Sequence, residues 1–525
     1  MYKPVKAEAR ALRRYNADLV LDSISKASTW RRRDEVGFAK ALERENIDYK
    51  AAFRDCQLAF VAKLALYVYN KPRLSQRQFT WKDLLEASRV LIKHQVPSSY
   101  PIESTEDLER FLIRVAYQQF PDFYGDADTL ARTSLLFRTS ARTVEAKLAF
   151  DIDAAYKEAT GLTLDESWDI SLAICGLLLT NGGGIQQGPL RVGDLKQNIS
   201  ELSLSRFFDM VSLTPDEFRQ QMDLPLYRVD PFETFNPNPL VNWPIVKLSN
   251  NRWVVPIFPY LFRRGTEQAF YDVIRCKGRE FSGYFGYVFE DYCDRILTTL
   301  GTSYEIIGGK RYTCDGRTYD TCDRIIVKDD NAVLIECKTK RLNLRTKFSA
   351  DKELLRYDLT DVGKVDDKSN VVSAIRQLYR TERDIRANCP GLEGLYQKIR
   401  GKMFPLVLVL DPYYLCNAPY IGQIIKEELG KGSPTIEGYN WQIVSARDFE
   451  QLCSLARLED FINLVAKKFE SIEFQLQEMD TFVQNYKLDG RQVDGDVLLH
   501  PIITTELDGF RKNLAARYGI KLKGK

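Results

Sequence analysis

The stretch Asp323-Arg-Ile-Ile-Val-Lys-Asp-Asp-Asn-Ala-Val-Leu-Ile-Glu-Cys-Lys338 holds two apolar runs on either side of a short polar group. The apolar runs are rich in β-branched residues, and the Asp and Asn residues between them favour a tight turn. This pattern predicts an antiparallel β-hairpin. If its turn centres near Asp330, Asp323 lies opposite the segment from Glu336 to Lys338.

The charged residues at the open end of this hairpin suit phosphodiester hydrolysis. Glu336 and Lys338 are two residues apart and share one face of their strand, whereas Cys337 points the other way. Two carboxylates and an ammonium group therefore converge, and burying them is costly unless a metal ion or an anion compensates. Mg²⁺ is typically held by one or two carboxylates, and a nearby lysine can position the attacking water. The alternative is a charged edge hairpin without catalytic function.

Asp323 rather than Asp320 is the expected metal ligand. The two acids are an odd number of residues apart, so on a regular strand they face opposite sides. A bulge between them would reverse this choice.

Four features around the hairpin fit the same chemistry. A helix predicted over residues 281–297 carries Glu290 beside its apolar stripe, and a later helix over 370–380 brings Gln377. A buried strand is predicted at 404–410. A basic run follows the hairpin and would hold a phosphate backbone: Lys340, Arg341, Arg345 and Lys347. The alternative for Glu290 and for the basic run is ordinary solvated surface.

With these motifs the chain resembles the PD-(D/E)xK nucleases, the restriction-endonuclease-like superfamily, over about residues 278–450. That family has an acidic helix, an Asp before a β-hairpin, Glu-x-Lys on the next strand, and then alternating helix and strand. The chain departs from the family at Cys322, where the first motif has proline. It is also similar to nucleases of prokaryotic antiviral defence, which often append such a domain to a helical half.

The resemblance implies roles for individual residues. Asp323 and Glu336 would be ligands of Mg²⁺, for which Mn²⁺ could substitute, and Lys338 would be the catalytic lysine. Glu290 matches the acidic position of the first helix and would join the metal ligands, and Gln377 matches a glutamine of some subgroups.

Composition sets outer bounds on the protein class. The chain has 525 residues, enough for two or three domains, and its net charge of +3 requires any nucleic-acid surface to be local. Ten cysteines include no Cys-x-x-Cys pair, so reduced cysteines in the cytoplasm are expected. No apolar run approaches the length of a membrane span, so no membrane association is expected. The only histidines, His94 and His500, argue against His-based nucleases and Ser-His-Asp triads.

The expected fold class is α+β multidomain. An N-terminal all-α domain precedes an α/β restriction-endonuclease-like domain with a central mixed sheet and a helical C-terminal tail, because helical patterns dominate the first part and strands alternate with helices later. Four segments are predicted: a helical regulatory or partner-binding domain (1–222), a proline-rich strap and connector (223–277), the nuclease-like domain (278–450) and a helical extension (451–525).

The expected function is that of a Mg²⁺-dependent endonuclease, with DNA favoured over RNA as substrate and a role as an effector of antiviral defence. The helical half is expected to bind a protein partner or a second copy of the chain. Two alternatives stay open: an RNA-cleaving enzyme of the same fold, and a non-catalytic partner-binding protein with a degenerate nuclease domain.

Overall fold

The computed structural model describes most of the chain: residues 3–48, 53–69, 77–95, 102–119, 126–184, 186–187, 199–228, 235–248, 252–360, 370–430, 441–488, 491–492 and 498–518. None of the helices in these ranges is both long and apolar enough to cross a membrane. The chain divides into two compact units. The first comprises Met1–Leu130, Asp151–Gly278 and Asn513–Lys525, and the second comprises Ala131–Phe150 and Arg279–Lys512.

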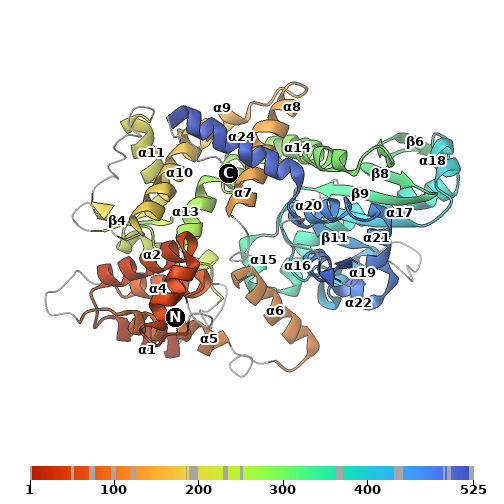
Figure 1. Ribbon diagram of the computed structural model, residues 1–525. Helices are drawn as coiled ribbons and strands as arrows, with labels where there is room; N and C mark the ends of the chain where they lie inside the picture. The colour runs from red at the N-terminus through yellow and green to blue at the C-terminus, as the bar shows by residue number, and fades with distance from the viewer. Residues whose placement is uncertain are drawn as a thin grey trace. The chain divides into compact units, whose positions relative to one another are not determined.

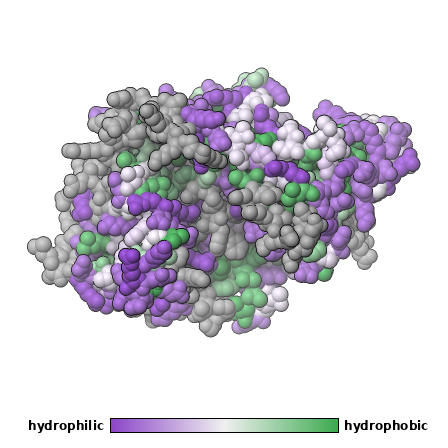
Figure 2. Space-filling model, in the orientation of Figure 1, coloured by the Kyte–Doolittle hydropathy of each residue, from purple (hydrophilic) through white to green (hydrophobic). Residues whose placement is uncertain are grey.

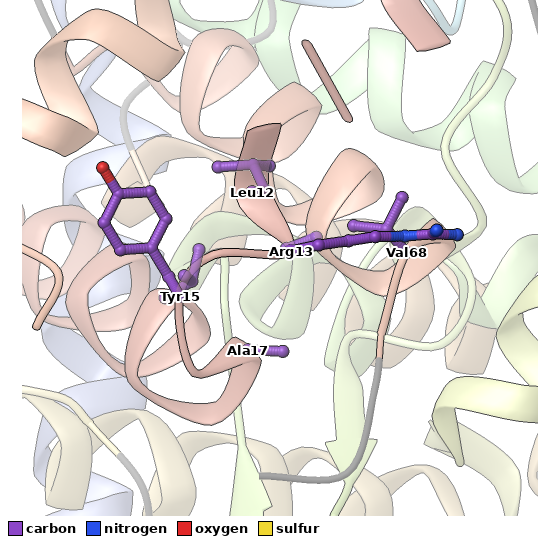
Figure 3. Close-up of a pocket in the computed structure, with 7 residues that line it drawn as sticks. Leu12, Arg13, Tyr15, Ala17 and Val68 are labelled. Atoms are coloured by element: carbon purple, nitrogen blue, oxygen red, sulfur yellow. The ribbon is translucent and has the colours of Figure 1, made fainter. Parts of the chain in front are cut away.

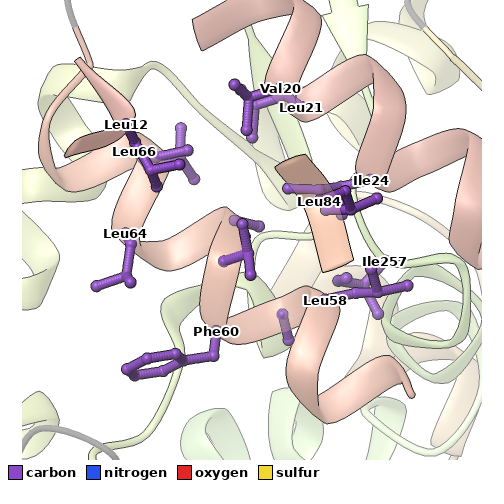
Figure 4. Close-up of a cluster of buried hydrophobic side chains, with 14 of the residues drawn as sticks. Leu12, Val20, Leu21, Ile24, Leu58, Phe60, Leu64, Leu66, Leu84 and Ile257 are labelled. Carbon is purple, nitrogen blue, oxygen red and sulfur yellow. The ribbon is translucent and has the colours of Figure 1, made fainter. Parts of the chain in front are cut away.

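The first unit is built mainly from helices (Figure 1). They are α1 (Lys3–Leu12), α2 (Ala17–Arg33), α3 (Glu35–Glu43), α4 (Asp55–Tyr67), α5 (Trp81–Gln95), α6 (Thr105–Gln119), most of α7 (Asp126–Ser134), α9 (Ile152–Thr160), α10 (Leu164–Asn181), α11 (Glu201–Val211), α12 (Pro215–Met222) and α13 (Phe258–Gly265). Its core gathers apolar side chains from α1, α2, α4 and α5, with Ile257 beside them (Figure 4). Helix α4 is buried along almost its whole length, which explains its nearly continuous apolar sequence.

A small four-stranded sheet accompanies these helices. Its order is β1 (Gln186–Gln187), β4 (Arg252–Val254), β3 (Ile245–Lys247) and β2 (Ser212–Leu213). The expectation of an all-α domain over residues 1–222 is therefore wrong at β1 and β2. These two-residue strands are too short to show a period, and each pairs with a strand from beyond residue 222. Residues 229–234 and 249–251 of the predicted strap lie outside the described residues.

The second unit contains a five-stranded mixed sheet, so the chain is a mixed α+β protein as predicted. The order is β11 (Gln442–Ser445), β10 (Met403–Val409), β9 (Asn331–Lys338), β8 (Arg324–Lys328) and β5 (Glu305–Gly308). Strands β9, β10 and β11 are parallel, whereas β8 is antiparallel to both of its neighbours. Every residue of β10 is buried, which is the pattern of a parallel strand inside a covered sheet.

The hairpin of β8 and β9 has a two-residue turn. Asp329 and Asp330 take φ values of 49° and 64°, the left-handed conformation that a type I′ turn requires at both positions. Asp and Asn adopt this conformation more readily than most residues, so the local sequence selects the turn. The hairpin predicted from the sequence is present.

Helices pack against this sheet. Helix α17 (Val371–Arg386) contacts β9 and β10, and α20 (Ala446–Leu455) and α21 (Phe461–Glu470) also contact β10. Helix α14 (Ala269–Leu297) is interrupted at Gly278, whose φ of 51° suits glycine, and the boundary between the two units falls there. The other α-helices described in this unit are α8 (Ala141–Glu145), α15 (Leu344–Ser349), α16 (Lys352–Thr360), α18 (Glu393–Lys398), α19 (Pro419–Gly430), α22 (Ile472–Leu476), α23 (Met479–Asn485) and most of α24 (Pro501–Tyr518).

Two short hairpins complete the second unit: β6 (Arg311–Cys314) with β7 (Arg317–Asp320), and β12 (Lys487–Leu488) with β13 (Arg491–Gln492). Figure 2 shows hydrophilic side chains over the end of this unit that carries β6 and α18. Cys314 of β6 forms a disulfide with Cys389, so the prediction of reduced cysteines is wrong for this pair. The two cysteines are 75 residues apart in sequence, and only the folded chain brings them together.

Residues 131–150 belong to the second unit because their side chains pack into it. The Phe137 and Phe285 rings lie 5.1 Å apart, and the Tyr284 hydroxyl donates a hydrogen bond to the Ala141 carbonyl at 3.0 Å. A bidentate ion pair joins Arg132 to buried Glu450, with Nε–Oε1 and Nη2–Oε2 distances of 2.6 and 2.7 Å.

Candidate active site

The register of the hairpin brings Asp323 to Glu336. Arg324 pairs with Ile335, so Asp323, which directly precedes β8, stands opposite Glu336. The backbone amide of Cys337 donates a hydrogen bond to Asp323 Oδ2 at 2.7 Å and fixes that carboxylate against the end of β9. Asp320 lies instead in β7, where it pairs with Arg311 at 3.1 Å and is largely exposed. The structure thus places Asp323, not Asp320, beside Glu336.

Glu336 and Lys338 lie on one face of β9, as their spacing predicts. The Lys338 ammonium donates a hydrogen bond to Glu336 Oε1 at 2.7 Å. Glu336 is only 2 % exposed. Its second oxygen, Oε2, is buried and has no hydrogen-bond partner among the described residues. A half-satisfied buried carboxylate is expensive, which marks this oxygen as a candidate cation ligand.

The protonation of this pair follows from its burial. Desolvation raises the pKa of Glu336 to about 8; Lys338 counteracts this rise, and the charge of Asp323 adds to it. Burial by itself would lower the pKa of Lys338, but the charge and hydrogen bond of Glu336 outweigh it, so the pKa is raised. Desolvation also raises the pKa of Asp323, although the Cys337 amide counteracts it. A cation between the two carboxylates would favour their ionised forms.

The donor set fits a hard divalent cation. Mg²⁺ is commonly held by one or two carboxylates and several waters, and Asp323 and Glu336 offer that number. In the described part of the chain, only Cys314, Asp384 and Cys389 bring three ligand atoms within 4.8 Å of one another. Both sulfurs of that group are in the disulfide.

Glu290 lies on α14 and contacts a different cation. Its Oε2 is 3.7 Å from Arg324 Nη1, and Arg324 also forms a bidentate ion pair with Asp294, one helical turn after Glu290. Burial, followed by the charge of Asp323, raises the pKa of Glu290 to about 7. The sequence reasoning missed Asp294 and Arg324. Asp294 follows Glu290 by four residues, and this spacing, which places both side chains on one face of a helix, could have indicated Asp294.

Gln377 supports the segment before Asp323. Its Nε2 donates a hydrogen bond to the Thr321 carbonyl at 2.8 Å. One turn later on α17, Thr381 Oγ1 accepts a hydrogen bond from the backbone amide of Cys322 at 3.0 Å. Cys322, which directly precedes Asp323, is completely buried. Helix α17 therefore anchors the chain that delivers Asp323 to the site.

Two side chains of the predicted basic run already form ion pairs with an acidic residue. Arg341 and Lys347 lie 3.4 and 3.6 Å from the two oxygens of Asp411, and both side chains are mostly buried. Lys340 is partly buried, and its carbonyl accepts a hydrogen bond from Tyr413. Arg345, on α15, is exposed. Of the four predicted phosphate-binding residues, two already have a carboxylate partner.

A small cavity lies in the first unit and contains none of these residues. It is lined by Leu12, Arg13, Tyr15, Ala17, Val20, Ala65 and Val68 (Figure 3). Its lining is mainly apolar and brings no acidic side chain.

No family model, curated protein or solved structure matches the chain.

Proposed function

We propose that this chain is a metal-dependent nuclease of the PD-(D/E)xK type that hydrolyses phosphodiester bonds in DNA. The observation that carries the proposal is the buried, unpartnered Oε2 of Glu336 beside Asp323 and Lys338. A charged edge hairpin without catalytic function would leave its carboxylates in water, where they carry no desolvation penalty. Here the carboxylate is removed from water and left half satisfied.

The order of elements supports the same proposal. The acidic helix α14 precedes β5 and the β8–β9 hairpin, and α17 and strand β10 follow. That is the sequence of elements that the family resemblance implies. The interposed β6–β7 hairpin is an addition between β5 and β8.

Each residue of the site has a task in this reaction. Asp323 and Glu336 would hold the divalent ion, which when bound polarises the phosphoryl group and makes a water more acidic. The Cys337 amide fixes the direction of Asp323, and Gln377 fixes the preceding segment. Lys338 keeps its positive charge next to the carboxylates, where it can orient the attacking water and offset charge that develops on the phosphate.

A cleavage assay with matched variants tests the proposal. The full chain is incubated with plasmid DNA, single-stranded DNA or RNA, with millimolar Mg²⁺ or Mn²⁺. Glu336→Gln should reduce the cleavage rate by about 100-fold or more, a common effect of losing one electrostatic contact in the transition state. Asp330→Asn makes the same chemical change in the turn of the same hairpin and should leave the rate unchanged.

The outcomes separate the alternatives. Cleavage of RNA alone would replace the proposed substrate while keeping the site. Absence of cleavage on all three substrates, or a Glu336→Gln variant as active as the wild type, would favour the non-catalytic, partner-binding alternative. Proposed roles in antiviral defence, and in regulation by the helical unit, become worth testing only after cleavage is observed.

A further inference from the structure

Arg324 forms the centre of a second charged cluster beside the proposed metal site. It is the first residue of β8, and its side chain reaches α14. Nη2 donates to Asp294 Oδ2 at 2.6 Å, Nε donates to the other oxygen, and Nη1 lies 3.7 Å from Glu290 Oε2. Nη1 also donates to the Asp323 carbonyl at 2.5 Å. Only 15 % of the side chain is exposed.

The site thus contains two acidic pairs, each with one basic residue. Asp323 and Glu336 have Lys338, which bonds one oxygen of Glu336 and leaves Oε2 open. Glu290 and Asp294 have Arg324, which engages both oxygens of Asp294. A planar guanidinium matches a carboxylate bidentately and keeps its charge at every accessible pH. The first acidic pair therefore keeps a carboxylate oxygen, Glu336 Oε2, that can bind another cation, whereas in the second pair both oxygens of Asp294 are already engaged by Arg324.

We propose that Arg324 takes the place that a second divalent ion would otherwise occupy, so that the chain binds one divalent ion, between Asp323 and Glu336. Glu290 then acts as a positioning residue for Arg324 rather than as the metal ligand that the family resemblance implies. The inference rests on the proposed function, since it concerns the same site. A second ion on Glu290 and Asp294 would have to displace a bidentate guanidinium or lie against its positive charge.

Calorimetric titration of the full-length, metal-free chain with Mn²⁺ tests the stoichiometry. The count is the total number of Mn²⁺ ions that the wild type binds, and one is expected. Glu336→Gln should weaken this binding by roughly 100-fold or beyond detection, because changing even an outer-sphere partner of a metal costs about 10- to 100-fold. Glu290→Gln should leave the dissociation constant within roughly threefold, the scale of a weak, partly exposed charge pair.

Substitution of Arg324 tests its role directly. Arg324→Met removes the guanidinium and should allow a second Mn²⁺ ion to bind, whereas Arg324→Lys retains the charge and should keep one. Circular dichroism checks that the variants fold. If Arg324→Met does not fold, the wild-type count and the Glu290→Gln dissociation constant decide the question.

Failure of this inference differs from failure of the proposed function. Two ions in the wild type, a loss of more than about tenfold in Glu290→Gln, or a folded Arg324→Met variant that still binds one ion would overturn the role of Arg324 and leave the nuclease proposal standing. Binding that is absent from the wild type, or unchanged in Glu336→Gln, would overturn the proposed site itself.

Discussion

Glu336 should make the metal-free protein less stable as the pH rises. Burial raises its pKa from an ordinary value of 4.5 to about 8 in the folded protein. The unfolded chain therefore releases this proton near pH 4.5, whereas the folded protein keeps it up to about pH 8. Between these values the folded state binds more protons, so stability falls with increasing pH. The Glu336→Gln variant keeps nearly the same shape and cannot ionise, so it lacks this dependence.

The size of the effect follows from proton linkage. Each pH unit within the window contributes up to about 1.4 kcal/mol. Between pH 5 and pH 7 the wild type should therefore lose roughly 2–3 kcal/mol relative to Glu336→Gln. Loss of the charge partner of Lys338 shifts the whole curve of the variant. This shift leaves the slope unchanged where Lys338 stays protonated in both proteins; Asp323 favours that form in each, although the variant lacks the contribution of Glu336 to the raised pKa.

Native-state hydrogen exchange of the amides in β8 and β9 measures the relevant quantity, because their opening free energy reports on this sheet rather than on the first unit. Asp330→Asn serves as the matched control and should follow the wild-type curve. Saturating Mg²⁺ should stabilise the wild type and Asp330→Asn but not Glu336→Gln, by about 2.7 kcal/mol at a concentration 100 times the dissociation constant. Parallel curves for wild type and Glu336→Gln, or a wild type that gains stability relative to Glu336→Gln as the pH rises, would refute the reasoning, since Glu336 would then be ionised in the folded protein.

Three further outcomes are expected. The dissociation constant for Mg²⁺ should fall by up to about tenfold per pH unit between pH 6 and pH 8, because Glu336 must lose its proton to bind a cation. Calorimetry measures this constant, and a value that does not change with pH would contradict the raised pKa of Glu336. Asp323→Asn should slow plasmid cleavage by about 100-fold or more while Asp330→Asn does not, and equal rates would remove Asp323 from the site. Arg345→Gln should make the slope of log binding constant against log salt concentration shallower by about 0.7–0.9 for DNA binding, whereas Asp411→Asn should steepen it by releasing Arg341 and Lys347 for phosphate. Fluorescence anisotropy at several salt concentrations measures both slopes. An unchanged slope in both variants would show that the basic run is only solvated surface.

The division into units changes how regulation by the helical half must be tested. Truncation is the obvious test, but a chain cut after the predicted helical domain, for example one that begins at residue 236, would also lack residues 131–150, which belong to the second unit. Its loss of activity would reflect the missing partners of Phe285 and Tyr284 as well as any regulatory contact. Substitutions confined to the surface of the first unit avoid this confusion.

Local sequence was sufficient for the elements of the site. The β-branched runs and the Asp-Asp turn specify the β8–β9 hairpin, because side-chain shape and left-handed turn residues act within a few positions. Period-two alternation correctly placed Glu336 and Lys338 on one face. The helical spacing of apolar residues predicted the helix that carries Glu290 and the helix that carries Gln377.

Tertiary structure decided which charges meet. Arg324 engages Asp294 from a helix 30 residues earlier, and Asp411 neutralises part of a basic run that follows a different strand. The Cys314–Cys389 disulfide and the assignment of residues 131–150 to the second unit likewise depend on contacts between distant segments. Burial of Glu336, on which the proposed chemistry rests, also arises only when the whole sheet is covered. Sequence patterns report what a residue does to its own backbone and near neighbours, whereas desolvation and ion pairing depend on every segment that the fold brings within a few ångströms.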